Sequence, residues 1–174
     1  WVYNSDHVTR IELSADLTRI ERTREYGKKD GFPVNQNMVV SKIEGRVYFA
    51  TTVGIYRYNV TNDAMEPCHE MNNLLNGETV YSRLVEYHDK LISLSAHEIG
   101  IANLGTYKRG SNTIITPIQQ PLIELVPGFE SIIVLSDSTM IVPNEDGFAL
   151  FSLNVSNNRQ DRSNALFIRN MYMS

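Results

Sequence analysis

The chain has 174 residues, of which 42% are hydrophobic and 21% are charged. This balance is typical of a folded globular protein and excludes a largely disordered one. The net charge of −4, with no basic cluster, argues against a nucleic-acid-binding surface. The single cysteine, Cys68, excludes an internal disulfide and a cysteine-based zinc site.

We expect neither a membrane-spanning segment nor a targeting segment within these residues. Its longest apolar stretches, such as residues 132–135, are far shorter than the roughly 20 residues that a spanning helix needs. The chain begins on Trp1, without a methionine or the basic region of a signal peptide. We therefore expect it to be a piece of a longer protein.

A short passage recurs four times along the chain: a tight polar turn, usually with a glycine, followed by an alternating strand. The four copies occupy residues 4–13, 52–59, 98–104 and 145–153. The anchor positions of the copies, spaced by 47, 46 and 47 residues, are His7, Gly54, Gly100 and Gly147. A fixed period of about 20 to 50 residues is typical of repeat architectures such as β-propellers.

Two further strands precede each of the last three copies. They are short runs rich in β-branched and aromatic residues, joined by small polar turns, as in antiparallel hairpins. In chain order the pairs are 38–43 with 47–51, 80–87 with 91–95, and 131–135 with 139–143. Each of these pairs, together with the strand of the copy that follows it, predicts a three-stranded meander.

A more polar strand follows each of the first three copies, at residues 17–23, 65–70 and 113–118. Pro67 and Pro117 lie in these segments, and proline is tolerated in an outermost strand because no ladder hydrogen bond is lost there. The repeating unit is thus four antiparallel strands, which is a propeller blade. We predict an all-β partial propeller of three to four blades over residues 1–153.

Three segments lie outside the predicted strands of the blades. Residues 71–77 predict one short helical turn that ends at Gly77. Residues 154–164 are polar and predict a linker. Residues 165–174 alternate like a strand but have no turn glycine, so we predict that they begin a different domain.

No catalytic, cofactor-binding or metal-binding residues are predicted. His69-Glu70 and His97-Glu98 each lack the second histidine, four residues after the first, of a zinc-protease helix. The Gly-x-Ser-x-Gly elbow of serine hydrolases and the glycine-rich phosphate loop are both absent from the sequence. The pattern therefore favours a binding or sensing scaffold over an enzyme.

The candidate ligand-binding residues lie around the third copy. They are Tyr87, His88, His97 and Glu98. A hairpin that brings them together would place them on one loop face, in contact with a polar ligand. The alternative is that they form an ordinary polar turn and an inter-strand loop.

Aromatic residues alternate along two adjacent predicted strands, as Tyr48, Phe49, Tyr56 and Tyr58. We expect most of them to pack between blades. Aromatic rings near blade ends are also suited to stacking on sugar rings, so both interpretations stay open.

Residues 46–59 resemble the propeller repeat of bacterial hybrid two-component sensors, which combine histidine kinase and response regulator parts. Residues 144–149 are similar to the last-blade pattern of that family. Residues 166–169 are similar to the entry strand of its Tyr-rich immunoglobulin-like domain. The first copy departs from the pattern with His7 in place of glycine, and the third with Ala102-Asn103 in place of Tyr-Arg.

The resemblance implies the periplasmic part of a membrane-anchored sensor in the inner membrane. Such a segment recognises a glycan or other nutrient and transmits the signal to a cytoplasmic histidine kinase, without catalysis of its own. A propeller-fold glycan-degrading enzyme and a non-catalytic protein-interaction propeller are the alternatives. An open stack of blades leaves two uncovered faces, so we also expect a homodimer or other self-association.

Overall fold

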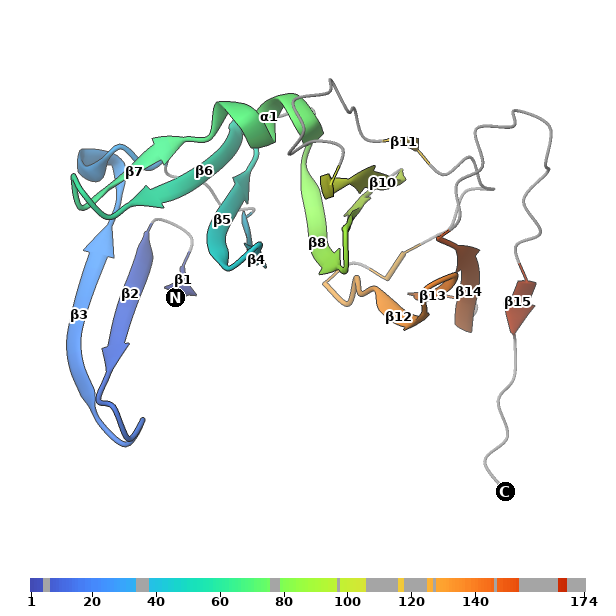
Figure 1. Cartoon of the computed structure of the whole chain (residues 1–174), viewed down its shortest axis with the longest axis horizontal. Helices are drawn as coiled ribbons and strands as arrows, with labels where there is room; N and C mark the ends of the chain where they lie inside the picture. The colour runs from blue at the N-terminus through green and yellow to red at the C-terminus, as the bar shows by residue number, and fades with distance from the viewer. Residues whose placement is uncertain are drawn as a thin grey trace. The chain divides into compact units, whose positions relative to one another are not determined.

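The computed structural model describes residues 1–4, 7–33, 38–75, 79–96, 98–105, 116–117, 125–126, 128–145, 147–153 and 166–168. These residues form four antiparallel β-sheets, and in each sheet the strands pair in chain order (Figure 1). The chain divides into an N-terminal unit, Trp1–Tyr81, and a C-terminal unit, Ser82–Ser174. Successive antiparallel meanders of three or four strands are propeller blades, so the predicted all-β partial propeller is confirmed.

The N-terminal unit contains the first two sheets. The first sheet comprises β1 (Val2–Tyr3), β2 (Val8–Leu13) and β3 (Ile20–Tyr26). After a short 3-10 helix (Lys28–Asp30), the second sheet comprises β4 (Met38–Ile43), β5 (Arg46–Thr51), β6 (Gly54–Asn59) and β7 (Ala64–Pro67). The helix α1 (His69–Leu75) follows. It begins two residues before the predicted helical turn at 71–77, inside the predicted strand 65–70, and Gly77 lies outside the described residues.

The other two sheets each have four strands. The third comprises β8 (Tyr81–Tyr87), β9 (Lys90–Ser95), β10 (Ile99–Asn103) and β11 (Thr116–Pro117). The fourth comprises β12 (Ile133–Ser136), β13 (Thr139–Asn144), β14 (Gly147–Ser152) and β15 (Leu166–Ile168). Pro67 and Pro117 lie in the edge strands β7 and β11, as predicted from their missing N–H groups.

The prediction that residues 165–174 begin a different domain is wrong for the strand that the structure describes. β15 pairs with β14 through Phe167 opposite Ala149, and is therefore the outer strand of the fourth sheet. Alternation along a strand identifies the strand but not its pairing partner. More than ten residues separate the outer strand from the strand before it in both the third and the fourth sheet; the predicted linker, 154–164, lies outside the described residues.

In every sheet the corresponding hairpin closes between two residues that are three positions apart in the sequence. The backbone N–H of Asn4 donates to the carbonyl of His7 at 3.0 Å, and that of Ser95 donates to Glu98 at 2.9 Å. In the other two sheets Thr51 pairs with Gly54 and Asn144 with Gly147.

The third anchor position is therefore Glu98, and its placement at Gly100 was wrong. Gly100 lies buried inside β10, opposite Ser93. Glycine is favoured only where the turn needs a positive φ, at Gly54 (129°) and Gly147 (127°). Gly100 is therefore a strand residue, two positions after the residue that closes the turn.

Aromatic side chains fill the core between the first and second sheets. Phe49 is fully buried there, and its ring meets the ring of Trp1 edge-on with centroids 5.3 Å apart. The core cluster around Phe49 comprises Val8, Tyr26, Phe32, Met38, Phe49 and Met65, with Trp1, Tyr56 and Tyr58 packed against it. The packing interpretation is thus confirmed for Phe49, Tyr56 and Tyr58.

A second core joins the third and fourth sheets. Its buried members are Ile92, Leu94, Ile99, Ile101, Ile132, Met140, Val142, Ala149, Phe151 and Leu153. Within the part of the chain that the structure describes, no helix has the length and apolar character needed to cross a membrane.

Helix α1 is tied to the start of β6 by the amide of Asn72. Its Oδ1 accepts from the backbone N–H of Ile55 at 2.8 Å, and its Nδ2 donates to the carbonyls of Ile55 (3.0 Å) and Cys68 (2.8 Å). The side chain thereby supplies both a donor and an acceptor to the backbone of Ile55, as a neighbouring strand would.

Replacement of Asn72 by alanine is expected to lower the free energy of unfolding by roughly 1–3 kcal/mol, because it leaves the backbone N–H of Ile55 without the side-chain oxygen that accepts from it. Urea denaturation measures the change. The matched control is Asn73→Ala, on the exposed side of the same helix, for which we expect a change within about 0.5 kcal/mol. Equal effects of the two substitutions would contradict the role given to the Asn72 amide.

Candidate ligand-binding site

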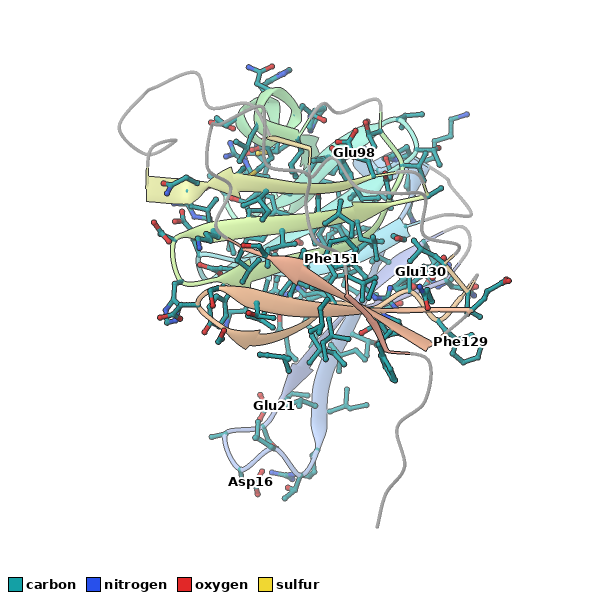
Figure 2. All side chains as sticks on the ribbon, turned by 90° about the vertical axis from the view of Figure 1, so that its right-hand side faces the viewer. Asp16, Glu21, Glu98, Phe129, Glu130 and Phe151 are labelled. Carbon is teal, nitrogen blue, oxygen red and sulfur yellow. The ribbon has the colours of Figure 1, made fainter. Side chains whose placement is uncertain are left out.

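The four predicted ligand-binding residues do not gather at one place. Tyr87 ends β8 and His88 begins the turn into β9, whereas Glu98 closes the turn at the other end of β9; Glu98 is labelled in Figure 2. β9 has six residues, so at about 3.3 Å per residue its two ends are roughly 17 Å apart. His97 lies outside the described residues.

Of the two interpretations, the one in which a hairpin brings His88 and Glu98 together is therefore wrong. His88 and Glu98 are only ten positions apart in the sequence, which suggested that a hairpin brings them together. In a meander, however, successive turns lie at opposite ends of the shared strand.

Tyr87 and His88 instead meet Asp137, from the turn between β12 and β13. The hydroxyl of Tyr87 donates to Asp137 Oδ1 at 2.9 Å, and His88 Nε2 lies 3.3 Å from the same oxygen. The two rings contact each other edge-on, with centroids 4.3 Å apart. Corresponding turns of two successive sheets thus lie together at one end of the C-terminal unit.

Lys90 completes this group, which we call the turn cluster: Tyr87, His88, Lys90 and Asp137. Lys90 Nζ donates to the backbone carbonyls of Asp137 and Leu153, both at 3.3 Å. The His88 and Asp137 side chains are 68% and 85% exposed, so solvent or a ligand reaches both. The hydrogen bond to Asp137 raises the pKa of Tyr87 above its usual value, because the bond needs the protonated phenol.

The turn cluster offers hydrogen-bond donors and acceptors beside aromatic ring edges. The Asp137 carboxylate meets the Tyr87 phenol and the His88 imidazole, and the Lys90 ammonium group reaches the backbone of Asp137. His88 and Asp137 are exposed, and Tyr87 and Lys90 are half-buried. His88 and Asp137 supply only two metal-ligand side chains, and no group of three or more His, Cys, Asp or Glu suited to a metal occurs among the described residues. The arrangement is suited to hydrogen-bonding a polar molecule.

Sequence reasoning missed Asp137 and Lys90. Asp137 stands in the turn between the first and second strands of its sheet, and His88 stands in the equivalent turn of the sheet before it. Alignment of these turns from one repeat to the next was the signal that could have paired them.

A second polar cluster lies in the N-terminal unit around Asp63, in the turn between β6 and β7. Asp63 Oδ1 accepts from the hydroxyls of Tyr26 (2.6 Å) and Tyr58 (2.8 Å), and its carboxylate pairs with the guanidinium of Arg24. Tyr26 is fully buried. Because these groups satisfy one another inside the unit, we assign this cluster to stability and not to ligand binding.

No protein-family model matches the chain. No curated protein matches it either. Among solved structures, the crystal structure of the N-terminal domain of Nup159 is similar at 11% identity and a TM-score of 0.41, over 86% of this chain and 33% of that one. The chain spans about a third of the length of that domain, and a similarity this low carries no argument about fold or function.

Proposed function

We propose that this chain is the ligand-sensing propeller segment of an extracytoplasmic receptor of the hybrid two-component type, and that it acts without catalysis. The turn cluster is the observation that carries the proposal. Its exposed polar groups come from two sheets and meet at one surface. The resemblance of residues 46–59 to the sensor repeat supports the receptor type.

The ligand class that suits the turn cluster best is an oligosaccharide or another hydroxyl-rich nutrient. A sugar hydroxyl both donates and accepts, so it matches the Asp137 carboxylate and the Lys90 ammonium group together. The Tyr87 and His88 rings provide aromatic surface for the C–H groups of a sugar. Hydrogen bonds within the cluster are exchanged for bonds to the ligand, which keeps the polar groups satisfied.

Signal transmission follows from the composition of the turn cluster. Tyr87 and His88 belong to the third sheet, whereas Asp137 belongs to the fourth. A ligand that bonds to both turns favours the conformation in which the turns are close together. A ligand shifts a conformational equilibrium only through such a difference in its affinity for the two states.

Titration of the chain with oligosaccharides from xylan, mannan, arabinan and pectin, followed by calorimetry, tests the proposal. We expect binding of at least one class, and a loss of about tenfold or more in affinity, or about 1.4 kcal/mol, for His88→Asn and for Asp137→Asn. Asparagine is chosen at position 88 because His88 has a φ of 53°, which asparagine tolerates.

Glu44→Asn is the matched control. Glu44 occupies the equivalent turn of the second sheet and has nearly the same φ, 51°, so the substitution repeats the backbone change away from the turn cluster. Binding that persists unchanged in both cluster variants would contradict this site. The absence of binding by all four classes would contradict the ligand class.

A further inference from the structure

One face of the fourth sheet lies in the core shared with the third sheet, and the other carries the exposed Ile133 and half-buried apolar side chains. Side chains alternate between the faces of a sheet, and Met140, Val142, Ala149 and Phe151 point into the core shared with the third sheet. On the opposite face Ile133 pairs with Ile141, and Ile141 pairs with Leu150. Ile133 is 47% exposed. We call this the fourth-sheet outer face: Ile133, Ile141, Phe148 and Leu150.

The first sheet also has an open apolar face. Val8 and Tyr26 lie in the core of the N-terminal unit, so their neighbours along β2 and β3 point the other way. Leu13 pairs with Ile20 on that side; Asp16 and Glu21, labelled in Figure 2, mark the end of this hairpin. The first-sheet outer face comprises Val2, Ile11, Leu13 and Ile20, and three of these are exposed: Val2 (54%), Leu13 (48%) and Ile20 (62%).

Alignment of the equivalent hairpin turns indicates whether each outer face corresponds to one that packs on the preceding sheet or on the following sheet. Aligning His7 with Gly54 places Val2 and Ile11 of the first sheet on Phe49 and Tyr58 of the second. Phe49 and Tyr58 belong to the face with which the second sheet packs on the first. The first-sheet outer face is therefore equivalent to the face of the second sheet that packs on the sheet before it.

The same alignment identifies the complementary kind of face. Phe148 of the fourth sheet corresponds to Val8 of the first when Gly147 is aligned with His7. Val8 belongs to the face with which the first sheet receives the second. The fourth-sheet outer face is therefore equivalent to the face of the first sheet on which the second sheet packs. The two outer faces thus correspond to the two faces that pack together in the N-terminal unit.

We infer that the fourth-sheet outer face of one copy of this chain binds the first-sheet outer face of a second copy. The occupant follows from the repeat: the chain itself carries the matching face, with the same hairpin alignment that already packs sheet on sheet in the N-terminal unit. The contact joins two different surfaces and is heterologous. It goes beyond the proposed function, because it involves no residue of the turn cluster.

Sedimentation of two charge-insertion variants, alone and mixed, tests the inference. The unmodified chain is expected to sediment as a dimer or larger species. Leu13→Glu and Ile133→Glu are each expected to sediment at the 19.8 kDa of one chain. In a sample of either variant alone, every contact between two copies would bury the introduced glutamate in an apolar interface. The equimolar mixture is expected to form a heterodimer, because one intact face remains on each variant.

Val53→Glu is the control, since Val53 is 62% exposed and lies in the turn between β5 and β6. Circular dichroism checks that each variant folds, and Ile20→Glu with Ile133→Lys repeats the test on the same two faces. A monomeric unmodified chain would overturn the inference and assign the open faces to another occupant. A Leu13→Glu variant that still self-associates, or a mixture that stays monomeric, would also overturn it.

Discussion

Replacement of Phe49 by alanine is expected to lower the free energy of unfolding of the N-terminal unit by about 3–5 kcal/mol, as large-to-small substitutions of buried aromatic residues do. Phe49 is fully buried, and its ring lies edge-on to those of Trp1 (5.3 Å) and Phe32 (5.7 Å). Its loss removes apolar burial and two aromatic contacts, and it leaves a cavity between the first two sheets. Trp1 is the chain's single tryptophan and lies beside Phe49, so its fluorescence during urea denaturation reports this unit.

Two further variants serve as comparisons for Phe49→Ala, one at an exposed position and one in the core of the other unit. Val53→Ala, at an exposed turn position, is expected to change stability by less than about 0.5 kcal/mol. Phe151→Ala removes a comparable ring from the core of the C-terminal unit, and hydrogen exchange measures its effect there. A Phe49→Ala loss no larger than that of Val53→Ala would contradict the central place given to Phe49.

Strand identity was predictable because local chemistry determines most of it. The stretch 46–51 is rich in β-branched and aromatic residues and is followed by a turn that ends at Gly54, and the structure places β5 and β6 there. Pro67 and Pro117 marked edge strands because a missing N–H is a property of the residue itself. These strand assignments depend only on the local sequence and not on which sheets are neighbours in the fold.

Pairing across long connections was not predictable by the same means. The pairing of β15 with β14 spans the segment 153–165, whose polar composition resembles that of an inter-domain linker. Glu98 in place of Gly100 shows the same limit on a smaller scale. The turn is defined by a backbone hydrogen bond, and no residue type is obligatory where φ is negative.

Half of the candidate site was visible in the sequence. Tyr87 and His88 stood out as an aromatic and an ionisable residue beside a polar turn. Asp137 is 50 residues from Tyr87, and only the stacking of one sheet on the next brings the two turns together. A tertiary contact of this kind follows from the repeat geometry and not from local spacing.

Replacement of Asp63 by alanine is expected to lower the free energy of unfolding by roughly 2–3 kcal/mol, because the polar groups that it pairs with lose their partner. The carboxylate accepts from the hydroxyls of Tyr26 and Tyr58 and pairs with Arg24, whose guanidinium also lies 5.0 Å from the centre of the Tyr26 ring. These contacts join β3 of the first sheet to the end of the second. Urea denaturation followed by Trp1 fluorescence measures the loss.

Asp63→Asn separates the charge of the carboxylate from its shape. Asparagine keeps an acceptor oxygen for the tyrosines and tolerates the φ of 47° at this position, but it loses the charge that pairs with Arg24. We expect about half of the loss seen with alanine. An Asp63→Asn variant as stable as the original chain would show that the ion pair contributes nothing.

Alkaline pH tests the same network through Tyr26. Burial is the main cause that raises the pKa of Tyr26 above its ordinary value of about 10. The folded state therefore favours the protonated phenol, and this contribution to stability is fully present below pH 10 or so and is lost as the pH rises through the raised pKa. A phenolate beside the Asp63 carboxylate would add repulsion. We expect the unmodified chain to lose stability above that pH and Tyr26→Phe to lose less, and identical pH profiles would contradict the role of this hydroxyl.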